Sequence, residues 1–379
     1  MTEKGGREKR PPFRLEGLTL EKRTYRILTL NPGSTSTKVA LFEDDAELWS
    51  DTQRYDVDVI HSYAGVMDQE EFRLEAIRDA LERHDTPIAS LDAVVGRGGL
   101  LKPIPGGTYL VGPTMIEDLK SCRWGSHASN LGAPLAARLA SEAGHDRAFI
   151  VDPVVVDELV PEARLSGIPE IERRSIFHAL NQKAVARRAA RDLGKAYEEV
   201  NLVVAHMGGG ISVGAHEAGR VIDVNNALDG EGPFSPERAG SLPAGEFMKL
   251  CFSGTYNLDQ VMKKLVGKGG LVAHLGTNDL REVVRRVDEG DAKAAMVFEA
   301  MAYQVSREIG SRAAALKGRV DAVILTGGLA YSTRFTDLIA SRVAFIAPVR
   351  VYPGEDESAA LAEGALRVLR GEEEPRKYA

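Results

Sequence analysis

The residues best suited to chemistry begin in a short polar turn within the segment Arg26–Asp44. Asn31, Ser34 and Ser36 lie in this turn beside Gly33, and apolar residues flank it on both sides. Hydroxyl and backbone N–H groups donate hydrogen bonds to an oxyanion, and a glycine lets the backbone approach it closely. The pattern therefore predicts a phosphate site at the tip of a β-hairpin. The alternative is an ordinary hairpin turn rich in serine and threonine.

Two further glycine-rich turns follow apolar segments later in the chain. The turn with His206, Gly208 and Gly210 repeats the strand, polar turn and strand of the opening hairpin. The turn with Gly327 and Gly328 lies between a predicted strand and a predicted helix, where a nucleotide can rest on backbone atoms and a helix N-terminus. The repetition favours two related α/β domains, each of which presents one hairpin to a shared cleft.

Several charged or imidazole side chains stand at the ends of predicted elements. Arg97 follows a strand, with a surface turn as the alternative, and Arg238 lies near the end of the long polar loop 221–242. Asp152 interrupts an apolar strand; because an unpaired buried carboxylate is costly, a nearby cation such as Mg²⁺ is expected. His178 lies near the start of a helix, and the alternative for it is a purely structural histidine.

Length and composition exclude several classes of protein. The chain has 379 residues, enough for two domains, and its formal net charge of -7 argues against nucleic-acid binding. The two cysteines, Cys122 and Cys251, have no metal-site spacing and suit a reducing cytoplasm. No run approaches the roughly 20 apolar residues of a membrane span. Residues 1–24 show no periodicity and are expected to be a flexible leader with no role in the fold.

Together, these motifs resemble the acetate kinase family. The run LNPGSTSTK ending at Lys38 matches its first signature and looks like the butyrate kinase branch. The other landmarks follow in the expected order: Arg97 after a strand, DPVVVDE at Asp152, FHALNQKAVAR at His178, then AHMGGGISV, PERAG at Arg238 and LTGGLAYS. The similarity extends from about residue 26 to residue 370.

The resemblance implies an α/β fold of duplicated ribonuclease H-like domains with a cleft between them. This is the fold of the acetate and sugar kinase, heat-shock ATPase (Hsp70) and actin superfamily. After the leader at 1–24, residues 25–152 plus 358–379 would form the N-terminal domain with the phosphoryl-transfer hairpin. Residues 153–357 would form the C-terminal, nucleotide-binding domain. The resemblance also implies a homodimer or a larger homo-oligomer.

The resemblance further implies ATP-dependent, reversible phosphorylation of a short-chain carboxylate to an acyl phosphate, with Mg²⁺. The catalytic residues would be Asn31, Ser34, Ser36, Arg97, His178 and Arg238. ATP or ADP would be bound by His206, Gly208, Gly210, Asp279, Leu280, Arg281, Gly327 and Gly328. Asp152 would help to hold Mg²⁺, with Glu357 assisting. The chemistry agrees, because an ionised carboxylate needs no general base and two repelling anions need cationic side chains between them.

The chain departs from the acetate kinases at a few positions. Gly99 and Ala227 stand where a bulkier residue and a proline are usual, which predicts a larger acyl pocket and favours butyrate or a branched acid. Gln182 replaces a second histidine, so no role is assigned to it. Two alternatives remain: an acetate or propionate kinase, and an actin-like ATPase that uses hydrolysis to switch a partner.

Overall fold

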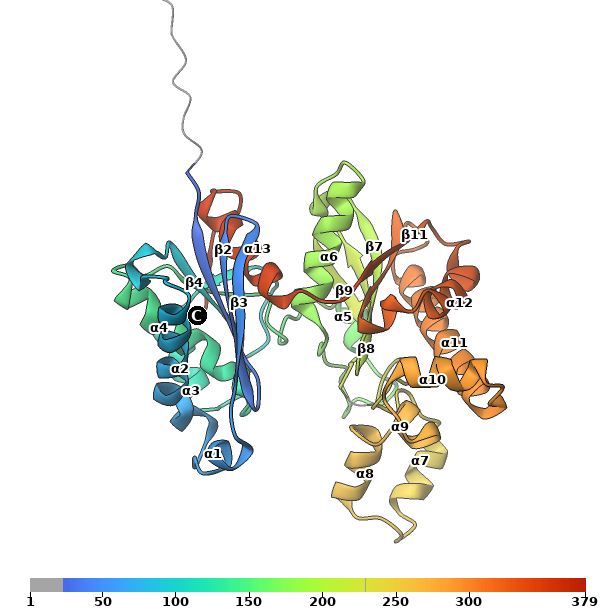
Figure 1. The fold of residues 1–379 in the computed structure, drawn as a ribbon. Helices are drawn as coiled ribbons and strands as arrows, with labels where there is room; N and C mark the ends of the chain where they lie inside the picture. Colours follow the sequence, from blue (N-terminus) through green and yellow to red (C-terminus); the bar gives the residue numbers. More distant parts are fainter. Residues whose placement is uncertain (1–22, 229) are drawn as a thin grey trace, which may run out of the picture.

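The computed structural model describes residues 23–228 and 230–379, so nearly all of the predicted leader lies outside the described residues. The described chain forms two α/β bodies, each built on one β-sheet (Figure 1). No helix in these ranges is long and apolar enough to cross a membrane.

The first sheet has the strand order β12-β5-β6-β4-β1-β2-β3. β1 and β2 form the predicted opening hairpin, and β4 and β6 follow β1 as parallel strands on its other side. The bounds are β1 (Arg26–Pro32), β2 (Ser36–Glu43), β3 (Ala46–Arg54), β4 (Ala93–Arg97), β5 (Thr108–Leu110), β6 (Ala148–Val151) and β12 (Arg376–Lys377).

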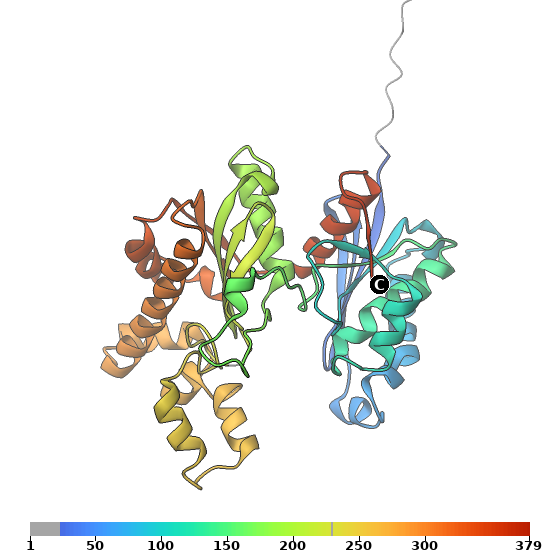
Figure 2. The same ribbon diagram turned by 180° about the vertical axis from the view of Figure 1, so that it is seen from behind.

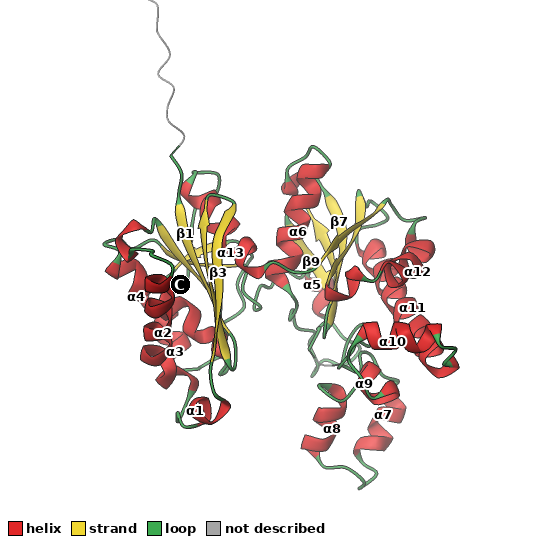
Figure 3. Cartoon of the chain, in the orientation of Figure 1, coloured by secondary structure: helices red, strands yellow, loops and turns green. Residues whose placement is uncertain are grey.

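Helices cover both faces of this sheet because alternate residues of each strand point to opposite sides (Figure 3). Leu28 and Leu30 pack toward α2 and α4, whereas Ile27 packs toward α13. The helices of this body are α1 (Val57–His61), α2 (Glu70–Arg83), α3 (Pro113–Lys120), α4 (Gly132–Glu142) and α13 (Glu357–Leu369). Short 3₁₀ segments lie at Val66–Gln69, Ile88–Ser90 and Ala128–Leu131.

The second sheet has the strand order β11-β10-β7-β8-β9. β7 and β8 form the second predicted hairpin, and the polar loop predicted at 221–242 proves to begin inside β9. The bounds are β7 (Asn201–Met207), β8 (Ile211–Glu217), β9 (Arg220–Val224), β10 (Ala322–Gly327) and β11 (Val349–Pro353).

One face of the second sheet carries α6, and the other carries α11 with its neighbours (Figure 2). The helices are α5 (Pro161–Arg164), α6 (Ala179–Asp192), α7 (Ala244–Cys251), α8 (Leu258–Leu265), α9 (Gly270–Leu275), α10 (Leu280–Asp288), α11 (Ala292–Ala315) and α12 (Thr333–Val343). Short 3₁₀ segments lie at Tyr197–Glu199 and Gly328–Tyr331.

The two bodies meet where α6 and α13 pack against each other. The chain passes between the bodies after β6 and again between β11 and α13 (Figure 1). We propose the predicted division into 25–152 with 358–379 and 153–357 as the domain boundary. The sheet to which each strand belongs supports it.

Candidate active site

Arg97, Asn31 and Glu357 lie together where β1, β4 and the start of α13 meet. Arg97 ends β4, and its Nη1 donates to a carboxylate oxygen of Glu357 at 2.5 Å and to the amide oxygen of Asn31 at 3.3 Å. Asn31 donates to the same Glu357 oxygen at 2.6 Å. All three side chains are only partly buried, so this corner of the first body holds a carboxylate at an accessible place.

Two histidines of the second body stack on each other with ring centroids 3.9 Å apart. His178 immediately precedes α6, and its Nδ1 lies 2.8 Å from the Ser212 hydroxyl. His206 is buried near the end of β7, 2.7 Å from the Asn181 side chain and 3.3 Å from Glu355. Burial, helped by the charges of Arg238 and Arg97, lowers the pKa of His178 to about 3. The imidazole is therefore neutral at physiological pH and close to both arginines.

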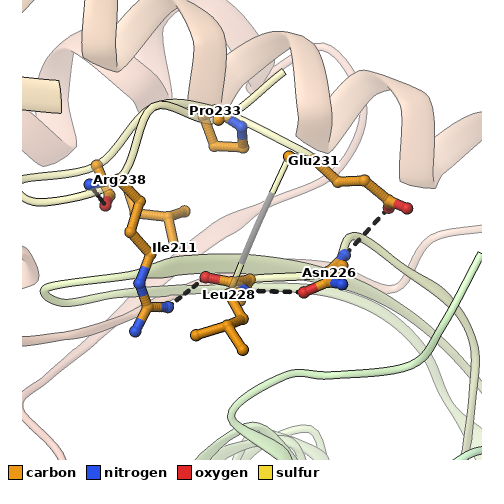
Figure 4. A pocket seen from close by; sticks show the side chains of 10 residues that line it. Ile211, Asn226, Leu228, Glu231, Pro233 and Arg238 are labelled. Atoms are coloured by element: carbon orange, nitrogen blue, oxygen red, sulfur yellow. Dashed lines mark hydrogen bonds between the residues drawn. The ribbon is translucent and has the colours of Figure 1, made fainter. Parts of the chain in front are cut away.

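Arg238 lies against the second glycine-rich turn. Its guanidinium donates to the carbonyl oxygen of Ala227, as Figure 4 shows, and it occupies the space where a side chain at position 210 would lie. A Cβ at Gly210 would come 1.9 Å from Nη1 of Arg238. Glycine at this position therefore lets the arginine reach across the turn, next to Ile211 and Leu228.

The predicted nucleotide turns lie side by side at one edge of the second sheet. Thr326 of β10 pairs with His206 of β7, which places Gly327 beside the turn that contains Gly208. Gly327 has a φ of 87°, and a Cβ there would come 2.5 Å from the carbonyl oxygen of Met207, so glycine is required for this close approach. Gly328 begins the following 3₁₀ segment with open space around it.

The segment predicted near the adenosine begins α10. Asp279 caps this helix and pairs with the exposed Arg281 at 2.6 Å. Asn278 bonds Glu237 at 2.6 Å, and Glu237 lies next to Gly209, so this segment is linked to the glycine-rich turn. The side chain of Leu280 is buried in the core of the second body, so any contact that this residue makes with a nucleotide would be through its backbone.

Arg73 stabilises the turn of the first hairpin through hydrogen bonds, a role that the sequence did not predict. This buried arginine of α2 donates to the carbonyl oxygens of Gly33 at 2.9 Å, Ser36 at 3.0 Å and Ser34 at 3.2 Å. The hydroxyls of Ser34 and Ser36 form no hydrogen bond within the described ranges, which leaves them available to a ligand. The available signal was the position of Arg73, which lies four residues before Ile77 on the apolar stripe of the helix.

We expect Arg73→Met to lower the free energy of unfolding by about 3 kcal/mol, because several carbonyl oxygens of the turn lose their hydrogen-bond donor. The urea midpoint of the intact chain measures this effect. Arg83→Met is the matched control on the same helix, since Arg83 is exposed and its 2.8 Å pair with Asp51 contributes less than about 1 kcal/mol. Equal midpoints for the two variants would contradict the structural role of Arg73.

Asp152 lies at the junction of the two bodies, paired with an arginine of the second body. Its side chain is fully buried after β6, where it accepts from the Gly107 N–H at 2.7 Å and from Arg187 of α6 at 3.0 Å. Burial acts to raise the pKa of Asp152, but the charges of Arg187 and Lys183 outweigh it and lower the pKa. These contacts satisfy the buried carboxylate within the described residues, and the magnesium role of Asp152 stays a prediction.

The predicted pocket at Gly99 is filled. A Cβ at this position would come 2.6 Å from Cα of Asn130 and 2.8 Å from a methyl group of Leu119, so the expectation of added acyl space there is wrong. The other predicted position, Ala227, lines a narrow recess with Ile211 and Leu228 next to Arg238 (Figure 4).

Comparisons with solved structures show which fold the chain adopts. The acetate kinase of Porphyromonas gingivalis matches with a TM-score of 0.76 at 19% identity, covering 91% of this chain and all of that one. A propionate kinase of Francisella tularensis matches with a TM-score of 0.69 at 19% identity, covering 90% and 98%. The fold is thus the α/β fold of these acetate and propionate kinases, in keeping with the predicted fold class.

Sequence comparison identifies the family. The chain is 56% identical over 354 residues to butyrate kinase 2 of Clostridium acetobutylicum, which covers 93% of this chain and 99% of that protein. The family model described as the acetokinase family matches residues 166–345. The chain belongs to the acetokinase family, whose kinases use ATP or ADP. The predicted family is confirmed.

Proposed function

We propose that the protein transfers the γ-phosphoryl group of ATP, reversibly, to the carboxylate of butyrate or a branched short-chain acid. The observation that carries this proposal is that Arg97 and Asn31 both donate to the Glu357 carboxylate, which supports a site whose donors suit a carboxylate. The identity of 56% to a butyrate kinase supports the choice of acid.

The residues of both bodies would act by positioning and charge. A carboxylate oxygen attacks the γ-phosphorus in line while the bond from that phosphorus to the bridging oxygen of ATP breaks. Arg97 would orient the carboxylate, since its fork matches the two oxygens, and Arg238 would hold the oxygens of the transferring group. The neutral His178 would donate one hydrogen bond to the charge that those oxygens share in the transition state.

Each of the two hairpins would contact a different part of the phosphate chain. The hydroxyls of Ser34 and Ser36, with the Asn31 amide, would line the path of the phosphoryl group. The turn with Gly208 and Gly210 would bind the β- and γ-phosphates of ATP through backbone N–H groups. Gly327 and Gly328, together with the segment from Asp279 to Arg281, would lie along the rest of the nucleotide.

The predicted magnesium ligand Glu357 lies at the start of α13, at the site. Mg²⁺ is usually held by one or two carboxylates together with substrate phosphates and water. Partial burial, together with the charge of Glu357, raises the pKa of Glu355. A cation bound between nucleotide phosphates and these carboxylates would relieve this repulsion. It would also supply charge neutralisation during transfer.

The proposal extends to assembly and location. We propose a homodimer or a larger homo-oligomer, as the family resemblance implies, in the cytoplasm. The free state of Cys122 and Cys251 suits that compartment. Neither nucleic acid nor a membrane is proposed as a partner, in keeping with the formal net charge of -7.

A panel of acids tests the proposed substrate. With ATP and Mg²⁺, hydroxamate trapping of the acyl phosphate and parallel detection of ADP should show a kcat/KM about fifteenfold higher for butyrate than for acetate. Two extra buried methylenes, at about 0.8 kcal/mol each, supply that ratio. Isobutyrate and propionate complete the panel. If kcat/KM is highest for acetate, acetate and not butyrate is the substrate. ADP production without acyl phosphate would indicate an ATPase.

A further inference from the structure

A chain of hydrogen bonds runs through the interior of the second body from Tyr197 to His178. The Tyr197 hydroxyl lies 2.7 Å from Nδ1 of His216, and Nε2 of His216 lies 3.0 Å from Oε1 of Gln182. The Gln182 amide nitrogen lies 3.0 Å from the Ser212 carbonyl oxygen and 2.8 Å from the Ser212 hydroxyl. That hydroxyl lies 2.8 Å from Nδ1 of His178. The four residues that lead to His178 are all buried.

The carbonyl oxygen of Ser212 fixes the direction of these bonds. A carbonyl oxygen only accepts, so the Gln182 atom beside it is the NH₂ group, and the atom that faces His216 is the amide oxygen. His216 therefore carries a proton on Nε2. Burial, together with the charges of Lys183 and Arg187, lowers the pKa of His216 well below its usual value, so the ring is neutral. Its Nδ1 then accepts from the phenolic hydroxyl at the far end of the chain.

The same reasoning reaches the site histidine. The second hydrogen of the Gln182 amide is donated to the hydroxyl oxygen of Ser212. The hydroxyl hydrogen of Ser212 can therefore be donated to Nδ1 of His178. A neutral His178 that accepts on Nδ1 carries its single proton on Nε2. Nε2 has no hydrogen-bond partner within residues 23–228 and 230–379, so its N–H group is available to a ligand.

We propose that Gln182 and Ser212 are positioning residues that hold the imidazole of His178 as the Nε2–H tautomer. The inference rests on the proposed function, in which this N–H group donates to the transferring phosphoryl oxygens. In the other tautomer, Nε2 would present a lone pair to those oxygens and repel them. A proton already in place needs no rearrangement when charge develops, which is how a preorganised donor accelerates transfer.

The tautomer can be measured without any substrate. Nitrogen-15 NMR of the full chain labelled at its eight histidines reports which imidazole nitrogen carries the proton, and a His178→Gln sample assigns the signals. We expect a protonated Nε2 and an unprotonated Nδ1 for His178. A proton on Nδ1 in the wild-type protein would overturn the inference. Because no substrate is present, this outcome is independent of whether butyrate is the acid.

Two variants test the link to catalysis. Ser212→Ala removes the donor to Nδ1, so the two tautomers should mix and kcat should fall about 10- to 100-fold, with KM for ATP near its wild-type value. Gln182→Glu keeps the shape but only accepts. The Ser212 hydroxyl should therefore turn toward it, and the proton of His178 should move to Nδ1.

Ser306→Ala is the matched control, because it removes another buried hydroxyl, which donates to the Ala302 carbonyl oxygen at 2.8 Å within α11. It should leave both the His178 signals and kcat unchanged. A wild-type kcat in Ser212→Ala, or an equal fall in Ser306→Ala, would reduce the role of Ser212 to packing and overturn the proposal.

Discussion

Arg97→Ala should lower kcat/KM for butyryl phosphate formation about 1,000-fold. The variant loses the guanidinium that binds the Glu357 carboxylate in the present structure and would bind the acid during catalysis. Removing a single preorganised donor from an anionic transition state costs about 100- to 1,000-fold, and a charged arginine belongs at the upper end of that range. The hydroxamate assay with saturating ATP measures the effect.

Two controls accompany this prediction. Arg97→Lys keeps the charge but loses the planar fork, so its activity should fall between those of the wild type and the alanine variant. Arg78→Ala removes a surface arginine that pairs with Glu142 at 2.6 Å, and it should leave activity unchanged. Acyl phosphate formation near the wild-type rate in Arg97→Ala would show that the carboxylate binds elsewhere.

Asp152→Asn should lower the free energy of unfolding by about 3 to 5 kcal/mol. The substitution removes the counter-ion of Arg187, whose charged side chain is almost buried. An unpaired buried charge is strongly destabilising. Denaturant unfolding of the intact chain measures it. In the double variant Asp152→Asn/Arg187→Met neither charge remains, so much of the loss should be recovered.

The pH dependence of stability and the magnesium dependence of activity distinguish a structural role of Asp152 from a magnesium-binding role. Its pKa is lowered in the folded chain, so the stability it contributes is present above the unfolded value of about 3.9 and is lost as the pH falls through the folded value. The difference in stability between the wild type and Asp152→Asn should therefore shrink below about pH 4. A magnesium ligand would instead give unchanged stability and a higher Mg²⁺ requirement.

The two hairpins could be predicted from the sequence because their information is local. The apolar residues around Asn31 and around Gly208 alternate or run in short blocks, and the turns between them contain glycine and polar residues. The resemblance supplied the order of the landmarks, and the structure brings Arg97, His178 and Arg238 close enough for both arginines to affect the imidazole.

The features that the sequence did not predict all depend on contacts between distant segments. Arg73 lies 40 residues after the carbonyl of Gly33 to which it donates. Asp152 finds its cation on a helix of the other body, and the space beside Gly99 is filled by Asn130. Residue type indicates that a buried charge needs a partner, or that a glycine has space beside it. Only the packing of the folded chain shows which residue is that partner or fills that space.

The return of α13 to the first body has a consequence during synthesis. This helix, with Leu361 and Ala365, covers the face of the first sheet that contains Ile27 and Phe149, and it comes from the C-terminal end of the chain. As the chain leaves the ribosome, this side of the first sheet lacks α13 until more than 200 later residues have followed Phe149. The second body is continuous in sequence and can be complete earlier, so the half that carries the phosphoryl-transfer hairpin should be the last to become native.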